Sequence, residues 1–206
     1  MPVQSTEKPL LTRFVMTSSR ESYTSQLIDK IPIPLVLSLA KPYLAGETPE
    51  EAIALAREIY KQKNHTSTLD ILGEDMDSDL TCDKSVIQYK ELVDAIKKNP
   101  LPVQEKHKQL TISLKPSMFS TRAPEANGRF DRDELTKAFK RILEVVDYAR
   151  ENGLNVTLEA EDHRWTDFHL DPSFKIIDQG YENFGTVLQS RLFKTARDIK
   201  NFDSRM

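Results

Sequence analysis

The chain has 206 residues, of which 38% are hydrophobic and 30% are charged, a composition typical of folded globular proteins rather than disordered ones. Its 29 Lys and Arg residues nearly balance its 32 Asp and Glu residues, which leaves a formal net charge of −3. This balance provides no strong positive field for a nucleic acid or an anionic membrane surface. We therefore expect no nucleic-acid partner.

Cysteine and glycine counts exclude further classes of protein. The single cysteine, Cys82, cannot form an internal disulfide, which suits a reducing compartment such as the cytoplasm. No pair of the six glycines has the spacing of a G-x-G-x-x-G turn or a G-x-x-x-x-G-K-[ST] loop, so dinucleotide-binding and P-loop folds are excluded. The apolar stretch at residues 31–40 is far shorter than the roughly 20 residues of a membrane helix.

Residues 1–33 are polar, rich in Ser and Thr and weakly periodic, which predicts a polar N-terminal arm. Apolar residues recur at helical spacing over residues 34–44 and predict a short lead-in helix. Thr48-Pro49-Glu50-Glu51 is a capping box with proline at the first helical position, and it predicts the start of a second helix. We expect residues 34–206 to form one domain, a helical lead-in followed by β/α units.

Short β-branched segments alternate with helical patterns over the rest of the chain. The strands are predicted at residues 66–72, 110–114, 154–158 and 184–188. The helices are predicted from a cap at Asp83 to Asn99, and over residues 132–152, 174–177 and 192–202. Four repeats of strand and helix are typical of parallel β/α units. The sequence therefore predicts an α/β fold with a parallel sheet.

Each predicted strand is followed at once by a polar or charged side chain; these are Glu74, Lys115, Glu159 and Gln189. Ligands bind parallel β/α folds at the carboxyl ends of the strands, so we expect these four side chains to converge on one face. Each also has an ordinary explanation. Glu74 could be a solvated loop residue, Lys115 could cover apolar surface with its stem, and Gln189 could complete the ladder of its strand. Their shared position after a strand favours a common site.

Other polar residues have weaker cases for a function. Glu161 and Asp162 are better explained as an acidic cluster at the start of a helix. His163 and His169 lack the spacing of known metal motifs, so no metal site is predicted.

Five segments carry a family resemblance. They are YLAGETPEEAIALAREI (43–59), TLDILGE (68–74), ISLK (112–115), VTLEAED (156–162) and GTVLQSRLFKT (185–195). In this order and spacing they resemble the flavin-dependent proline dehydrogenases, particularly the small bacterial monofunctional type. The similarity extends from about Pro34 to the C-terminus, and TLDILGE and VLQS are its most specific parts.

The resemblance implies a (β/α)8 TIM-type barrel preceded by helices, with FAD over the carboxyl ends of the strands. The family oxidises L-proline to pyrroline-5-carboxylate by hydride transfer to the flavin, which then passes electrons to a quinone at the membrane. By this resemblance the chain is an oxidoreductase of proline catabolism, cytoplasmic and at most peripheral to the membrane.

The resemblance also implies roles for the residues that follow the strands. Lys115 pairs with the substrate carboxylate, and Glu74 belongs to an ion-pair gate above the substrate. Glu159 takes the catalytic position beside flavin and substrate, where the family usually has an aspartate. Ala160 is a backbone contact to the isoalloxazine, and Gln189 is a hydrogen bond to the flavin.

The sequence departs from the family pattern in three side chains and in length. Glu159 is one methylene longer than aspartate, Pro116 follows the lysine, and Arg191 replaces an aromatic residue. The chain ends after the helix that follows its fourth predicted strand, so we expect about four strands of the barrel, from a truncated gene or a split enzyme.

Four strands alone leave two unpaired edges and, by this argument, expose apolar side chains meant for a barrel interior. We therefore expect a homo-oligomer or a second chain that completes the barrel. The alternative is a catalytically silent remnant that serves as an interaction module.

Overall fold

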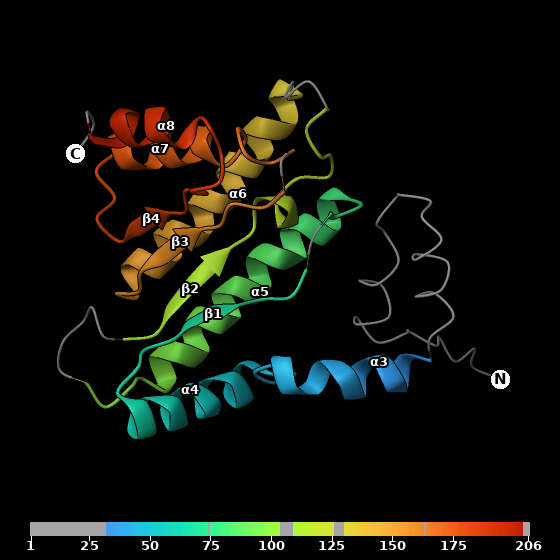
Figure 1. Ribbon diagram of the computed structural model, residues 1–206, viewed down its shortest axis with the longest axis vertical. Coiled ribbons are helices and arrows are strands. Elements are labelled where there is room, and N and C mark those ends of the chain that lie inside the picture. The colour runs from blue at the N-terminus through green and yellow to red at the C-terminus, as the bar shows by residue number, and fades with distance from the viewer. Residues whose placement is uncertain (1–31, 74, 104–108, 126–129, 163, 204–206) are drawn as a thin grey trace. The chain divides into compact units, whose positions relative to one another are not determined.

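The computed structural model describes residues 32–73, 75–103, 109–125, 130–162 and 164–203 (Figure 1). The chain divides into two compact units, residues 1–47 and residues 48–206. In the first unit, α3 (Ile33–Ala40) and the 3-10 helix η1 (Lys41–Tyr43) occupy the predicted lead-in. The predicted arm at residues 1–33 lies outside the described residues except at its last two positions.

The second unit begins with α4 (Pro49–Lys63), which starts as the sequence predicts. Thr48 is the N-cap, and its Oγ1 accepts the Glu51 N–H at 3.3 Å, while Pro49 is the first helical residue. The helix ends at Asn64, which adopts a left-handed φ of 53°.

Four short strands form one sheet in the order β1-β2-β3-β4, and every neighbouring pair is parallel. They are β1 (Thr68–Asp70), β2 (Thr111–Leu114), β3 (Val156–Leu158) and β4 (Phe184–Thr186). The register aligns Asp70, Ser113, Thr157 and Gly185 across the sheet. The predicted α/β fold with parallel β/α units is confirmed, although the hydrogen-bonded strands are shorter than predicted.

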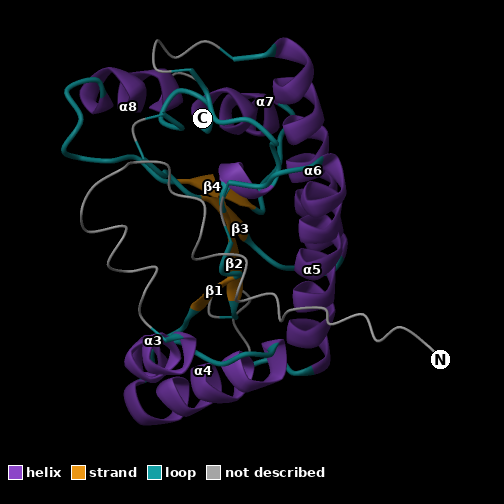
Figure 2. Ribbon diagram, turned by 90° about the vertical axis from the view of Figure 1, so that its right-hand side faces the viewer, coloured by secondary structure: helices purple, strands orange, loops and turns teal. Residues whose placement is uncertain are grey.

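Helices connect the strands in sequence order. They are α5 (Asp79–Lys98) between β1 and β2, α6 (Arg132–Glu151) between β2 and β3, α7 (Leu170–Asp178) between β3 and β4, and α8 (Thr195–Asp203) after β4. A 3-10 helix, η3 (Pro116–Met118), follows β2. Figure 2 shows α5 and α6 side by side along one face of the sheet. Among the helices of the described ranges, none is both long and apolar enough to cross a membrane.

The start of α5 differs from the prediction. Ser78 is the N-cap: its Oγ accepts the Thr81 N–H, and the Thr81 hydroxyl accepts the Ser78 N–H, which completes a capping box. Asp83 lies inside the helix and pairs with Arg141 of α6 at 2.8 Å, so the prediction that it caps this helix is wrong. The reciprocal Ser78 and Thr81 bonds satisfy the first turn, and a second cap is not needed.

The two faces of the sheet carry different side chains. One alternate set is buried against the helices and consists of Leu69, Ile112, Leu114, Val156 and Leu158. The other set points to the opposite face and is polar or small: Thr68, Asp70, Thr111, Ser113, Thr157 and Gly185. The expectation that the strands expose apolar side chains on the barrel-interior face is therefore wrong.

Candidate active site

The carboxyl ends of β2, β3 and β4 bring three predicted site residues to one end of the sheet. Lys115 directly follows β2, and Glu159 directly follows β3, where its N–H donates to the Leu114 carbonyl at 2.8 Å. Gln189 follows β4 after two residues and reaches the segment behind β3. Glu74, the fourth predicted residue, lies outside the described residues.

Lys115 is held by a carboxylate on the neighbouring strand. Its Nζ lies 2.7 Å from Oδ2 of Asp70, the last residue of β1, and both side chains are partly exposed. The Tyr89 hydroxyl donates to the other Asp70 oxygen at 3.3 Å, and burial raises the pKa of Tyr89, which keeps this phenol protonated. An ammonium has three N–H donors, so an ion pair with one carboxylate leaves donors for an anionic ligand.

Gln189 is oriented by two backbone carbonyls. Its Nε2 donates to the carbonyl of Ala160 at 3.3 Å and to that of Glu161 at 2.9 Å. Because both neighbours are acceptors, the amide nitrogen faces them and Oε1 points away. That oxygen is buried without a hydrogen-bond partner in the structure. An unsatisfied buried acceptor costs about 1–3 kcal/mol, a cost that a ligand N–H would remove.

Glu159 is half-buried, and its carboxylate makes no hydrogen bond or ion pair with the described part of the chain. Ala160 follows it, and the Ala160 carbonyl is one of the two acceptors for Gln189. An acidic group and an oriented amide therefore follow two adjacent strands of the sheet. Such a pair provides an acceptor for a cationic or N–H-bearing ligand.

Glu161 does not have the place that the sequence indicated. The next helix, α7, begins only at Leu170, so the interpretation of Glu161 as part of a helix-start cluster is wrong. Its two carboxylate oxygens accept the Ser117 N–H at 2.7 Å and the Ser117 hydroxyl at 2.5 Å. Burial raises the pKa of the Glu161 carboxyl, although the Ser117 donors and the positive charge of Lys115 oppose that rise.

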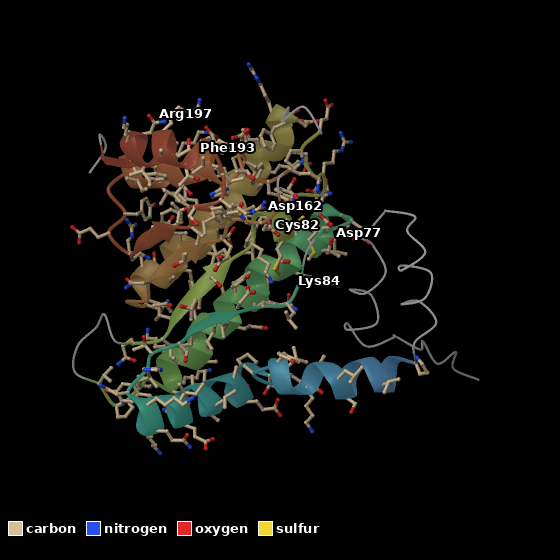
Figure 3. The ribbon with its side chains drawn as sticks, viewed as in Figure 1. Asp77, Cys82, Lys84, Asp162, Phe193 and Arg197 are labelled. Carbon is tan, nitrogen blue, oxygen red and sulfur yellow. The ribbon has the colours of Figure 1, made fainter. Side chains whose placement is uncertain are left out.

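Asp162 is not at a helix start either, since α7 begins at Leu170; it lies in a polar turn at the end of the sheet where the chain leaves β3 (Figure 3). Its carboxylate accepts the Arg164 N–H at 2.8 Å and pairs with the Arg164 guanidinium at 2.7 Å. Arg164 also lies 3.7 Å from Asp75, in the segment after β1. These charges link the turns that follow two different strands.

Asp70, Ser117 and Glu161 contact the predicted site residues or their neighbours, and the sequence did not assign any of them to the site. Asp70 had a usable signal, because it lies within the specific TLDILGE segment and is the last residue of its strand. Ser117 and Glu161 are separated by 44 positions in the chain and had no local pattern that joins them. Their pairing depends on the parallel alignment of β2 and β3.

A cavity of about 320 Å³ lies beside the start of α6, where Arg122, Phe130, Glu134 and Phe168 are among its lining residues. None of the predicted site residues that the structure describes lines it. Within the described residues, no group of three or more His, Cys, Asp or Glu side chains is placed to hold a metal ion. The residues that follow the strands therefore define the candidate site.

Comparison with known proteins identifies relatives of this chain. A family model described as proline dehydrogenase matches residues 53–204. The proline dehydrogenase of Deinococcus radiodurans is 28% identical over 170 residues, which cover 81% of this chain and 49% of that protein. Proline dehydrogenase 1 of Bacillus subtilis subsp. natto is 25% identical over 164 residues, which cover 78% and 47%. The chain thus spans about half the length of these curated relatives.

Solved structures of proline utilization A (PutA) share the fold. PutA from Bdellovibrio bacteriovorus, inactivated by N-propargylglycine, superimposes with a TM-score of 0.71 and 23% identity, covering 88% of this chain and 20% of that one. A mutant of PutA from Bradyrhizobium japonicum gives a TM-score of 0.63 with 19% identity, covering 88% and 19%. These likenesses show that the β/α units have the same arrangement in space.

Proposed function

This chain belongs to the proline dehydrogenase family, and from that premise we propose that it forms the first half of an FAD-dependent site that oxidises L-proline to pyrroline-5-carboxylate. The observation that carries the proposal is the arrangement after β2, β3 and β4. A lysine ammonium, a carboxylate that has no partner among the described residues, and an oriented amide lie there at one end of a parallel sheet. The chain spans about half the length of its curated relatives, so its residues supply only part of the contacts that a complete site would make.

The residues present fit a flavin. Gln189 Oε1 is a buried acceptor without a partner, and an isoalloxazine offers an N–H donor that would satisfy it. The backbone of Ala160, which Gln189 holds, would contact the same ring system. When bound, FAD supplies the acceptor for a hydride. Gln189 and Ala160 would hold it, and Lys115 and Glu159 would face the substrate.

The substrate carries a carboxylate and a ring amine, and the side chains that follow β2 and β3 match these groups. Lys115 binds the carboxylate of L-proline through a charge-assisted hydrogen bond. Glu159 would face the amine, whose N–H proton would leave as the ring carbon beside it gives up a hydride to the acceptor and the C=N bond forms. The Glu159 carboxylate would accept that proton. Glu74, which is outside the described residues, keeps the role in an ion-pair gate that the family resemblance implies. Two electrons leave the site for a quinone or another acceptor.

The test is whether L-proline reduces FAD in the presence of this chain. The purified chain is incubated with FAD, alone and together with the product of any adjacent reading frame, and the flavin absorption band is followed after L-proline is added. Bleaching of that band with proline but not with glycine supports the proposal. A colourless chain in both preparations would contradict it and favour a silent interaction module. The proposal places the chain in the cytoplasm, and an electron acceptor that is a membrane quinone would require peripheral contact with the membrane.

A further inference from the structure

Both oxygens of the Glu161 carboxylate bind the same residue, Ser117, in the segment after β2. One oxygen accepts a hydrogen bond from the backbone N–H and the other accepts one from the hydroxyl. Ser117 is buried in η3, directly behind Lys115 and Pro116. Pro116 restricts the backbone at the first position of η3, so a fixed Ser117 also fixes the direction in which Lys115 leaves β2.

The same two residues are tied to the other neighbouring segments. The Glu161 carbonyl accepts a hydrogen bond from Gln189, which follows β4. The Ser117 carbonyl accepts the Met76 N–H at 3.4 Å, from the segment after β1. The pair of Ser117 and Glu161 therefore connects segments that follow all four strands. We call these two residues the clasp.

We propose that Glu161 is a positioning residue, which fixes the separation between Lys115, on the substrate side, and the Ala160 and Gln189 contacts, on the cofactor side. This inference rests on the proposed function. A carboxylate suits this task, because it accepts two hydrogen bonds in a fixed plane from a donor pair on one residue. Each of those bonds is charge-assisted and short, and so tolerates little displacement of the two loops.

Substitution by glutamine distinguishes a carboxylate that acts by holding a position from one that acts through its negative charge. In Glu161→Gln the amide oxygen still accepts the Ser117 N–H, and the amide nitrogen can donate to the Ser117 hydroxyl. Position is retained while the negative charge is lost. In Glu161→Ala both bonds are lost, and in Ser117→Ala only the hydroxyl bond is lost. The three variants thus separate the geometry of the clasp from its charge.

The experiment uses the full chain in the FAD-binding preparation of the previous test. The dissociation constant of FAD is measured from flavin fluorescence. That of a non-oxidisable proline analogue, with oxygen in place of the ring nitrogen, is measured from the shift of the flavin absorption band. Glu144→Gln, which alters an exposed carboxylate on α6 paired with Lys90, is the matched control. Urea unfolding checks that each variant is folded.

We expect Glu161→Ala to weaken the binding of both FAD and the analogue by about tenfold or more, because it removes both charge-assisted hydrogen bonds from Ser117. Ser117→Ala should have a smaller effect in the same direction, since it removes only the hydroxyl bond, and it should add little to Glu161→Ala because both substitutions act on the same contact. Glu161→Gln should retain most of the binding. Glu144→Gln should match the wild type.

Two results would overturn the positioning role. Wild-type affinities in Glu161→Ala would show that the clasp does not set the site, while the proposed function would stand. Equal losses in Glu161→Gln and Glu161→Ala would show that the charge acts directly. A wild-type chain that binds neither FAD nor the analogue in either preparation would overturn the proposed function, and the positioning role with it.

Discussion

An ion pair with Asp70, on the neighbouring strand, holds the Lys115 side chain in position. Asp70 and Lys115 end or follow adjacent parallel strands, so the register brings an acid and a base within 2.7 Å without any help from a loop. The Tyr89 hydroxyl holds the second Asp70 oxygen, which limits rotation of that carboxylate. Such a pair is partly solvated and adds little to stability. Its consequence is orientation: the ammonium is held at the carboxyl end of the sheet.

Replacement of this lysine should separate substrate binding from cofactor binding. We expect Lys115→Ala to weaken the binding of proline more than that of FAD, because it removes a charge-assisted hydrogen bond to the substrate. Such a bond contributes roughly 1.5–3 kcal/mol, which corresponds to a loss of about one to two decades in affinity. Lys115→Arg should also be impaired, because a planar fork does not replace a compact ammonium in a close-fitting site. Flavin fluorescence measures the dissociation constant of FAD, and titration with the proline analogue measures that of the substrate site.

Lys84→Ala, which changes an exposed lysine on α5 labelled in Figure 3, is the control for this comparison. A Lys115→Ala chain that lost FAD yet kept normal proline affinity per bound flavin would assign the lysine to the cofactor or to the fold.

Hydrogen bonds between neighbouring residues set the start of α5, but the N-cap is not Asp83, the residue that the sequence first indicated. Asp83 is a good N-cap by type, yet Ser78 has a better partner, because Thr81 returns a hydrogen bond to the Ser78 N–H. The helix therefore begins earlier, and Asp83 is left to pair with Arg141 of α6. That same Arg141 also contacts Asp79, in the first turn of α5. The cap thus determines which acidic residues face α6.

The cap predicts a difference between two substitutions in α5. Ser78→Ala should lower the free energy of unfolding by about 1 kcal/mol, because it removes the acceptor of the first turn. Asp83→Ala should cost less, since it removes one arm of an exposed ion pair. Urea denaturation followed by circular dichroism measures both. A larger loss for Asp83→Ala would place the functional cap where the sequence first indicated it.

In the second unit, the side chains on the two faces of the sheet differ, and this difference explains why the candidate site lies at the carboxyl ends of the strands and not on a face of the sheet. The helices α5 and α6 cover one face with buried Leu, Ile and Val, while the opposite face is lined by Thr, Ser, Asp and Gly. The unpaired edges are β1 and β4. A polar face needs no apolar cover, so the site of this unit is defined by the side chains at the ends of the strands.

The second unit should lose stability in mild acid through His169. This buried side chain connects α7 to the segment after β4, with its Nε2 3.0 Å from the Val187 carbonyl. Burial lowers the pKa of His169 from 6.5, because the charged form is poorly solvated there. The unfolded chain therefore binds more protons than the folded one, so the free energy of unfolding should fall as the pH falls through 6.5.

His169→Gln should flatten this pH dependence because it removes the titrating group. Unfolding in urea at pH 8 and at pH 5.5 gives the two free energies, and His65→Gln, at an exposed histidine, is the matched control. An unchanged difference between the two pH values in His169→Gln would assign the acid sensitivity to other groups.

Several parts of this protein could be predicted from its sequence because they depend on neighbouring residues. Capping by Thr48, helical periodicity and short β-branched segments predict α4, α6 and the four strands within a few residues. The positions of Lys115 and Glu159 at the ends of strands follow from the same local patterns. The motifs also sufficed to indicate the family, since TLDILGE, ISLK and VLQS retain their order and spacing.

Only the tertiary structure decided which of these residues meet. The partners of Lys115, Glu161 and Gln189 lie 45, 44 and 28 positions away in the chain, and they become neighbours through the alignment of parallel strands. The sequence indicated that polar residues follow each strand, but not that Ser117 occupies the Glu161 carboxylate while Gln189 keeps one oxygen unpaired. Local propensity acts over a few residues, whereas these contacts depend on the register between strands and on the burial that the helices impose.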